Sequence, residues 1–232
     1  LTELTAIFDF FRPLYKDFQD SVALDIGANI GNHSIYFSRY FQRVHAFEPH
    51  PITQKILELN TSFYSKISVH GYGLSDCVGE MMLDENPTNL GGSRIVLSGQ
   101  GHYRIHLKRL DDIELDRRKL ALIKLDVEGH EAKVLRGGLE TLKQSMPLIL
   151  FEAHADDFDG PMEEVNLLKA MGYVFVWIQP LGAGIMKYMR VIGQLFTGKK
   201  KRILCAGDVI PRGDYSMIIA VPQQWAGSLN LR

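Results

Sequence analysis

Apolar residues along the chain follow two patterns, short runs typical of buried strands and a spacing of three or four residues typical of helices. An amphipathic helix is predicted within residues 1–20, with its apolar positions at Leu4, Ile7, Phe8, Phe11, Leu14, Tyr15 and Phe18. Strands are predicted at residues 22–26, 44–47, 67–70, 120–125, 148–151, 173–178 and 215–221. This alternation predicts an α/β fold, a doubly wound and mostly parallel sheet with helices on both faces.

Two helices are predicted between the first three strands. The first follows Gly31 and runs to about Tyr40, with Ile30, Phe37 and Phe41 facing the sheet. The second begins at Pro51, since proline is favoured at the first helical position. Its predicted buried stripe consists of Ile52, Ile56, Leu59 and Phe63.

Neither a repeat nor a clear domain boundary is visible, so residues 1–232 are expected to form one domain. Alternating segments and the pair Gly91-Gly92 predict a β-hairpin insertion over residues 79–110. Residues 181–212 form a variable segment rich in basic residues, namely Lys187, Arg190, Lys199, Lys200, Lys201 and Arg202.

A glycine turn after the first strand indicates a ligand site. Asp25, Gly27 and Gly31 form the pattern Asp-x-Gly-x-x-x-Gly, and Glu48 ends the next strand about twenty residues later. Such a carboxylate can accept hydrogen bonds from a ribose. The middle glycine of a dinucleotide motif is absent, and Asp25 would repel a phosphate but attract an ammonium group. S-adenosylmethionine is therefore favoured over NAD, although glycine could also serve the turn alone.

A second set of ionisable residues follows the strand at 120–125. Asp126 and Glu128 would share a face if the strand alternation continues past the turn. Glu152 and His154 end the next strand in the same way. All four are expected at the carboxyl edge of the sheet, where α/β proteins bind ligands. His130 could be a turn residue or a functional one.

Several motifs in this order resemble the FkbM family of S-adenosylmethionine-dependent methyltransferases. They are Asp25–Gly31, Phe47-Glu48-Pro49, Gly73-Leu74-Ser75-Asp76, Leu110-Asp111-Asp112, Lys124–Gly129 and Glu131–Gly138. The resemblance covers about residues 20 to 155. It implies the class I methyltransferase fold, with a Rossmann-like sheet of seven strands whose last strand is antiparallel. It also implies O-methylation, often of sugar hydroxyls or of hydroxyls on secondary metabolites.

The same resemblance assigns roles to individual residues. The methionine end of the cofactor would be held by Asp25, Gly27, Asn29 and Gly31, with Ala28 in the same turn. The nucleoside would be held by Glu48 and Pro49 at the ribose and by Leu74, Ser75 and Asp76 near the adenine. Asp126 would stand beside the sulfonium and amino groups, and Glu128 would face the acceptor. No role for His130 is implied.

Methyl transfer to a hydroxyl needs a base for the hydroxyl proton. The candidates for this base are Glu128, His154 and His130, and the first two are favoured over the third. Histidine suits the role because its ordinary pKa lies near 6.5. In a less favoured variant, Asp126, Glu152 and His154 would hold Mg²⁺ or Mn²⁺ and activate the hydroxyl.

The net charge of −1 gives no overall attraction to nucleic acid or anionic membranes. The local basic segment is either a solvated loop or a contact for an anionic acceptor, such as a nucleotide-linked or lipid-linked sugar, or for a membrane surface. Nucleic acid is disfavoured because no aromatic platform accompanies the cluster. No apolar run is long enough to cross a bilayer. Cys77 and Cys205 lack metal-ligand spacing, which predicts a reducing, cytoplasmic setting.

The sequence thus predicts an O-methyltransferase that acts on a sugar, glycan or secondary-metabolite hydroxyl. Two alternatives remain open at this point, a NAD-dependent oxidoreductase and a non-catalytic cofactor-binding domain within a larger assembly. The first residue is Leu1 and not Met, and the sequence leaves open whether this is the natural start or the start of a trimmed or excised domain. The pattern indicates no oligomeric state.

Overall fold

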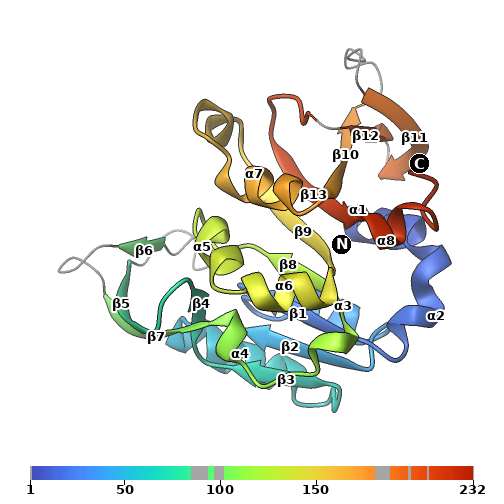
Figure 1. Ribbon diagram of the computed structural model, residues 1–232. Coiled ribbons are helices and arrows are strands. Elements are labelled where there is room, and N and C mark those ends of the chain that lie inside the picture. Colours follow the sequence, from blue (N-terminus) through green and yellow to red (C-terminus); the bar gives the residue numbers. More distant parts are fainter. Residues whose placement is uncertain are drawn as a thin grey trace. The chain divides into compact units, whose positions relative to one another are not determined.

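The structure is a computed structural model that describes residues 2–84, 94–96, 102–180, 189–197, 200–207 and 209–231. The chain divides into two compact units (Figure 1). One consists of Phe18–Pro147, and the other combines Leu1–Asp17 with Leu148–Arg232.

The unit of residues 18–147 is built on a parallel sheet in the order β8-β1-β2-β3. Its strands are β1 (Val22–Ile26), β2 (Arg43–Phe47), β3 (Ile67–His70) and β8 (Leu120–Leu125), which confirms the strands predicted there. Its helices are α3 (Asn32–Phe37), α4 (Pro51–Thr61), α5 (Glu131–Arg136) and α6 (Leu139–Ser145), with 3-10 turns at Leu110–Asp112 and Arg117–Lys119. All residues of β1 and β8 are buried, as expected for central strands covered on both faces.

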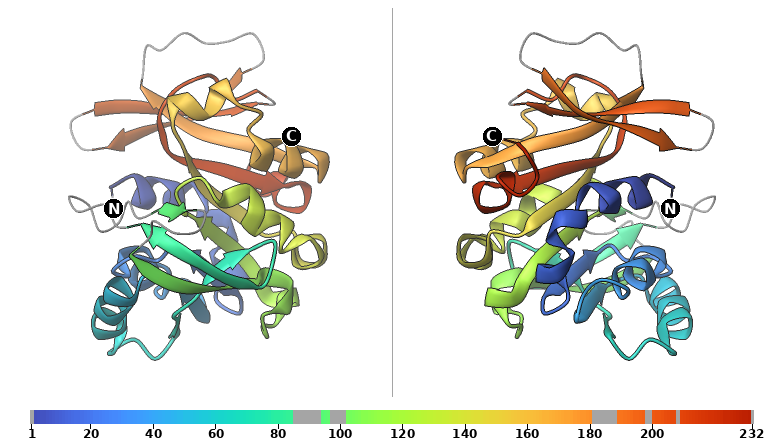
Figure 2. Two further views of the ribbon diagram at one scale, coloured as in Figure 1. Left: turned by 90° about the vertical axis from the view of Figure 1, so that its left-hand side faces the viewer. Right: turned by 90° about the vertical axis from the view of Figure 1, so that its right-hand side faces the viewer.

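A second, smaller sheet in this unit has the order β4-β7-β5-β6. Its strands are β4 (Gly73–Ser75), β5 (Gly79–Asp84), β6 (Arg94–Val96) and β7 (Tyr103–Arg109). β5 runs antiparallel to both β6 and β7, and Leu83, Ile105 and Leu107 form a core of their own. Gly91 and Gly92 lie outside the described residues. Figures 1 and 2 show this sheet beside the carboxyl ends of β1 and β2.

Helix α4 begins at Pro51 as predicted, but the prediction of its buried face was wrong. Ile52, Ile56, Leu59 and Phe63 are 36% to 94% exposed. The buried positions are Thr53, Leu57 and Thr61, and Leu57 packs with Ala28 and Ala46. The threonine hydroxyls bond within the helix region, Thr61 to the Leu57 carbonyl and Thr53 with His50, so that their burial costs little.

Helix α3 is also shorter than predicted, since it ends at Phe37 instead of Tyr40. Phe37 and Phe41 are fully buried, as expected, whereas Ile30 is 37% exposed. Ile30 precedes the helix, in the turn that Gly31 ends in a left-handed conformation (φ 94°), so it does not share the helical face of the two phenylalanines.

The other unit is an antiparallel sheet in the order β11-β12-β10-β13-β9. Its strands are β9 (Leu148–Ala153), β10 (Tyr173–Pro180), β11 (Met189–Thr197), β12 (Lys200–Gly207) and β13 (Tyr215–Pro222). Its helices are α1 (Thr2–Phe10), α7 (Glu163–Ala170) and α8 (Gln223–Ala226), with 3-10 turns at Arg12–Leu14 and Ala155–Asp159. The last strand, β13, is antiparallel to both neighbours.

The N-terminal amphipathic segment is interrupted near Pro13. Helix α1 ends at Phe10, a 3-10 turn follows over Arg12–Leu14, and α2 (Tyr15–Phe18) completes the segment. Proline lacks a backbone N–H and its ring clashes with the preceding turn, which explains the break. The predicted apolar positions Leu4, Ile7, Phe8, Phe11, Leu14 and Phe18 are nevertheless buried.

The described part of the basic segment includes two paired strands, where the sequence left a solvated loop open. Arg190 lies in β11, and Lys200, Lys201 and Arg202 lie in β12, whose pairing Figure 2 shows. Lys187 and Lys199 lie outside the described residues. In the part of the chain that the structure describes, no helix is both long and apolar enough to cross a membrane.

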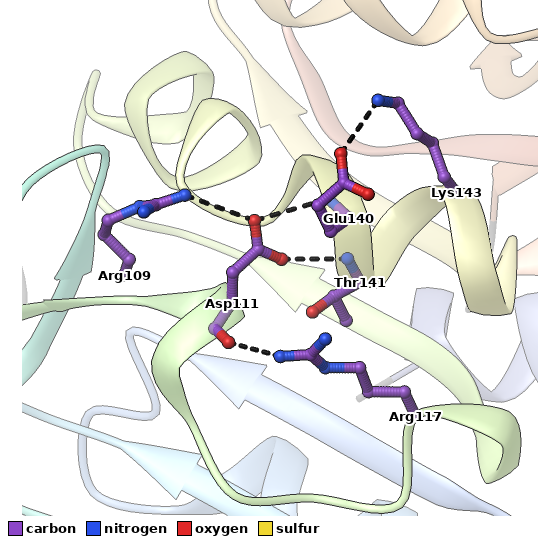
Figure 3. A network of polar contacts seen from close by, with 6 residues as sticks. All are labelled: Arg109, Asp111, Arg117, Glu140, Thr141 and Lys143. Carbon is purple, nitrogen blue, oxygen red and sulfur yellow. Dashed lines mark hydrogen bonds and ion pairs between the residues drawn. The ribbon is translucent and has the colours of Figure 1, made fainter.

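Asp111 caps the first turn of α6 (Figure 3). The N-cap residue of this helix, Gly138, has no side chain that could accept a hydrogen bond. The Asp111 carboxylate accepts the backbone N–H groups of Thr141 at 2.8 Å and Glu140 at 3.3 Å. Arg109 donates to the same carboxylate, and Arg117 donates to the Asp111 carbonyl. The motif Leu110-Asp111-Asp112 thus has a structural role.

Replacing Asp111 with alanine is expected to destabilise the protein by about 2 kcal/mol, the upper range for an N-cap carboxylate, because two helix N–H groups lose their acceptor. Urea unfolding monitored by circular dichroism measures the effect. Asp112→Ala is the matched control, since the neighbouring Asp112 is exposed. Equal losses in the two variants would contradict the capping role.

Candidate functional site

A cleft lies at the carboxyl ends of β1, β2 and β8, next to the small sheet. The space between its walls, open solvent included, is about 670 Å³. Its lining residues are Ile26, Gly27, Asn29, Phe47, Glu48, Pro49, Gly73, Leu74, Leu83, Asp126, Val127, Glu128 and His130. The lining combines apolar walls with three carboxylates, and among these residues none is lysine or arginine.

The glycine turn after β1 forms one wall of the cleft. Gly27 has φ 75°, and a Cβ atom there would lie 1.8 Å from the Asp126 carbonyl oxygen, so only glycine fits. The N–H groups of Gly27 and Ala28 both donate to the Phe47 carbonyl at the end of β2. Asn29 is also left-handed, with φ 49°. The turn is therefore tied to both neighbouring strands, β2 and β8.

Glu48 stands where β2 ends and is largely buried. Its two carboxylate oxygens accept the backbone N–H groups of Asn29 and His50, each at 2.9 Å. These two bonds fix the carboxylate against the glycine turn. Burial raises the pKa of Glu48, although both N–H groups favour the ionised form. Each oxygen keeps a lone pair for a further donor.

Lys124 connects the tips of β1 and β8 from behind the cleft. Its Nζ atom lies 3.0 Å from the Gly27 carbonyl oxygen, 3.0 Å from Asp126 Oδ2 and 3.6 Å from Asp25 Oδ1. The Lys124 and Asp25 side chains are 2% and 0% exposed. Ser34 Oγ also donates to Asp25, at 2.5 Å. Asp25 therefore bonds to protein groups and is absent from the cleft lining, which differs from the expectation that it contacts the cofactor directly.

The loop after β8 brings Asp126, Val127 and Glu128 to the cleft. The strand alternation predicted that Val127 points away, which was wrong because β8 ends at Leu125 and the chain turns there. Glu128 has φ 52°, a conformation that non-glycine residues rarely adopt and that occurs often at functional sites. Glu131 accepts the Val127 N–H at 3.1 Å, so its carboxylate supports this loop.

His130 follows in the same loop and also lines the cleft. Its Nε2 atom lies 2.9 Å from Ser75 Oγ, and the residue is 6% exposed. Burial lowers the pKa of His130 to about 4, with Lys133 nearby acting in the same direction. The ring is therefore neutral at neutral pH. Ser75 and Asp76 are not among the lining residues, and neither are Ala28 and Gly31.

The remaining candidates, Glu152 and His154, belong to the other unit. His154 follows β9 and is exposed, and its backbone N–H donates to Asp157 Oδ2 at 2.6 Å. Glu152 is the residue before last in β9. Across the described parts of the chain, no group of three or more His, Cys, Asp or Glu side chains that could hold a metal ion is found.

The model of the methyltransferase FkbM domain matches residues 25–175. The chain belongs to the FkbM methyltransferase family. The family named from the sequence motifs is thereby confirmed, and the matched region of this FkbM chain contains every residue of the cleft lining.

Two curated relatives and one solved structure resemble the FkbM chain. The hexuronic acid methyltransferase AglP of Haloferax volcanii is 33% identical over 151 residues, which are 63% of this chain and 62% of that protein. The AMB antimetabolite synthetase AmbE of Pseudomonas aeruginosa is 31% identical over 184 residues, 61% of this chain but 9% of that protein. The chain thus spans less than two thirds of the length of either relative.

The solved structure is a Streptococcus mutans protein described as a methyltransferase, in complex with SAH. It covers 94% of this chain and 97% of its own, with a TM-score of 0.50 and 12% sequence identity. At that identity the likeness concerns the fold alone. The predicted α/β class I methyltransferase fold of the FkbM chain is confirmed.

Sequence reasoning missed five lining residues and the lysine behind them. The lining residues are Ile26, Phe47, Gly73, Leu83 and Val127. Leu83 comes from the small sheet, whose position next to the cleft has no periodic signal in the sequence. Lys124 did have a signal, because a lysine within an apolar strand covered on both faces needs a buried carboxylate partner.

Proposed function

We propose that this chain is an S-adenosylmethionine-dependent O-methyltransferase that acts on a hydroxyl of a sugar or glycan. The observation that carries the proposal is the set of three carboxylates, Glu48, Asp126 and Glu128, that line one cleft. Such a site suits a ligand with a ribose and a cationic end. A dinucleotide fits poorly, because the lining residues include no lysine or arginine to pair with a pyrophosphate.

The residues of the cleft fit the cofactor part by part. Glu48 would hold the ribose hydroxyls with the lone pairs that its two backbone N–H bonds leave open. Asp126, whose carboxylate Lys124 orients at 3.0 Å, would attract the positively charged end. When bound, S-adenosylmethionine supplies a methyl group on a positively charged sulfur. The chain's own tasks are then to align the acceptor and to remove its hydroxyl proton.

Glu128 is our choice for the base, since it lines the cleft from a left-handed loop position that the surrounding bonds maintain. Its carboxylate would take the proton of the acceptor hydroxyl as that oxygen bonds to the methyl carbon, while the carbon–sulfur bond breaks and its electron pair neutralises the sulfur. No metal ion is required for this step, so turnover is expected to survive exhaustive EDTA treatment.

The sugar acceptor is supported by the relative named as a hexuronic acid methyltransferase. A neutral hydroxyl acceptor would be methylated by the same chemistry. The acceptor would be tested with labelled methyl donor and a panel of uronic acids, nucleotide-linked sugars and lipid-linked sugars. Labelling of neutral secondary metabolites alone would contradict the sugar assignment.

Isothermal titration calorimetry with S-adenosylmethionine, S-adenosylhomocysteine and NAD tests the cofactor. We expect the first two to bind and NAD not to bind, and the reverse would overturn the proposal in favour of an oxidoreductase. Tight cofactor binding without a labelled product from any acceptor in fractionated extract would favour a non-catalytic cofactor-binding domain.

The pKa of Glu48 leads to a prediction about acid. Burial raises this pKa above its usual value of 4.5, so the ionised carboxylate is lost as the pH falls through the raised value. Only the ionised form accepts from both ribose hydroxyls while holding its two N–H donors. Affinity for S-adenosylhomocysteine should therefore be full at neutral pH and fall in mild acid.

Calorimetry across a pH series measures this loss. Glu48→Gln should bind about tenfold more weakly at pH 7, as expected for loss of a charged acceptor, and should show a flatter acid dependence. Glu58→Gln, at an exposed position of α4, is the control and should keep the wild-type profile. An unchanged acid dependence in Glu48→Gln would contradict the ribose role.

A further inference from the structure

The imidazole of His130 is held at one end of the cleft by a chain of three polar groups. Its Nε2 atom lies 2.9 Å from the hydroxyl of Ser75, the last residue of β4 and 1% exposed. The Ser75 hydroxyl in turn donates to Asp76 Oδ1 at 3.2 Å. Arg136 donates to the other oxygen of Asp76 at 3.4 Å. His130 therefore lies beside Leu74, at the small-sheet side of the cleft.

This series of hydrogen-bonded groups selects one tautomer of the His130 ring. A carboxylate only accepts hydrogen bonds, so the single proton of the Ser75 hydroxyl goes to Asp76. The Ser75 oxygen must then accept from His130, which places the ring proton on Nε2. Nδ1 is left with a lone pair, and among the described residues it has no hydrogen-bond partner. Because the ring is neutral at neutral pH, this lone pair is available as an acceptor.

The surroundings of Nδ1 suit an aromatic base with an amino group. Leu74 and Leu83 line the cleft on the same side, and both are almost fully buried. The carboxylates Glu48, Asp126 and Glu128 come from the tips of β2 and β8 instead. Asp76, which the family resemblance places near the adenine, has both oxygens engaged by Ser75 and Arg136 and does not line the cleft.

We propose that His130 is the residue that recognises adenine, with Nδ1 accepting a hydrogen bond from the 6-amino group while Leu74 and Leu83 contact the ring. Ser75 is a positioning residue that acts through His130 by fixing its tautomer. This inference rests on the proposed function, and it replaces the expectation that His130 is a general base. Hypoxanthine has a carbonyl at position 6, whose oxygen would face the lone pair of His130 Nδ1. Since both atoms only accept hydrogen bonds, this base would be rejected.

The test compares the binding of S-adenosylhomocysteine with that of S-inosylhomocysteine, its deaminated analogue, by calorimetry. Wild-type protein should prefer the adenine compound by about 10- to 100-fold, the cost of leaving one buried acceptor unsatisfied. His130→Phe keeps a ring but removes the acceptor, so the preference should fall to less than about threefold. Affinity for the inosine compound should change little.

Two further variants separate recognition from general damage to the site. The amide oxygen of His130→Asn can take the place of Nδ1, so this variant should retain much of the preference. His130→Gln extends its amide toward the position of Nε2 and should lose it. Ser75→Ala releases the tautomer and should lower the preference several-fold, while thermal melting checks that each variant is folded.

Some results would overturn the inference. They are a wild-type protein that binds both compounds equally, and a His130→Phe variant that weakens both by the same factor. A wild-type protein that binds neither compound would refute the proposed function itself, and the assignment of His130 with it. The two failures are thus distinguishable by whether the wild-type protein binds the nucleosides at all.

Discussion

Lys124→Met is expected to destabilise the protein by about 3 to 5 kcal/mol, the cost of breaking a buried ion pair by removing one partner. Methionine fills nearly the same space, so packing changes little. Asp25, with a side chain that is 0% exposed, would lose its nearby ammonium group, and among the described residues only the Ser34 hydroxyl would still donate to its carboxylate. The Gly27 carbonyl and Asp126 would lose a donor at 3.0 Å each.

The double variant Lys124→Met with Asp25→Asn tests whether charge is the cause. Removing both charges leaves no uncompensated carboxylate, since asparagine can still accept from Ser34. The double variant should therefore be clearly more stable than Lys124→Met alone, with a coupling between the sites of about 1 kcal/mol or more. Strictly additive losses would contradict the ion-pair explanation.

Equilibrium unfolding in urea gives these free energies. Lys143→Met is the matched control, because Lys143 pairs with Glu140 at the surface and its side chain is 61% exposed. An exposed pair of this kind contributes at most about 1 kcal/mol. A loss in Lys143→Met equal to that in Lys124→Met would show that the position of the lysine does not matter.

The parts of the fold that the sequence predicted well are those with a strong local signal. The strands at 22–26 and 120–125 are apolar runs with one charged residue each, Asp25 and Lys124, as expected for strands buried on both faces. Gly27 and Glu48 were found because each follows a predicted strand, and a Cβ atom at Gly27 would lie 1.8 Å from the Asp126 carbonyl oxygen, so that the turn admits only glycine.

The failures have a common physical origin in tertiary context. On α4 the apolar residues face outward and Thr53, Leu57 and Thr61 face inward, because hydroxyls that bond locally can be buried at little cost. Periodicity alone cannot distinguish the two faces. The lysine beside Asp25 is likewise a matter of tertiary context, since it follows from the register that pairs Asp25 with Lys124 across β1 and β8.

The sequence allowed the carboxylates of the cleft to be predicted, but not the apolar residues of its walls. Glu48, Asp126 and Glu128 follow strand ends, which meet at one edge of a parallel sheet. Leu83 comes from a strand of the small sheet whose pairing is long-range, and Val127 lines the cleft because β8 ends at Leu125 and the strand alternation ends with it. The role of His130 depends on Ser75, which is 55 residues away in the chain.

Glu128→Gln is expected to lower the turnover number by about 10²- to 10⁴-fold, the usual contribution of a general base. Glutamine keeps the size and the hydrogen-bonding shape of the side chain but cannot take a proton. Because the cofactor contacts proposed for Glu48 and Asp126 remain, the affinity for S-adenosylhomocysteine should stay within about threefold of wild type. Steady-state kinetics with the identified acceptor, combined with calorimetry, measures both quantities.

The neighbouring carboxylates provide the comparison that makes this result decisive. Glu131→Gln removes a charge from the same loop, yet its amide oxygen can still accept the Val127 N–H, so turnover should fall far less. Glu140→Gln, at the surface of α6, should leave turnover unchanged. His154→Gln tests the rival base in the other unit. If that variant loses turnover while Glu128→Gln retains it, or if Glu128→Gln loses only cofactor affinity, the proton is taken elsewhere and the strained position of Glu128 serves binding instead.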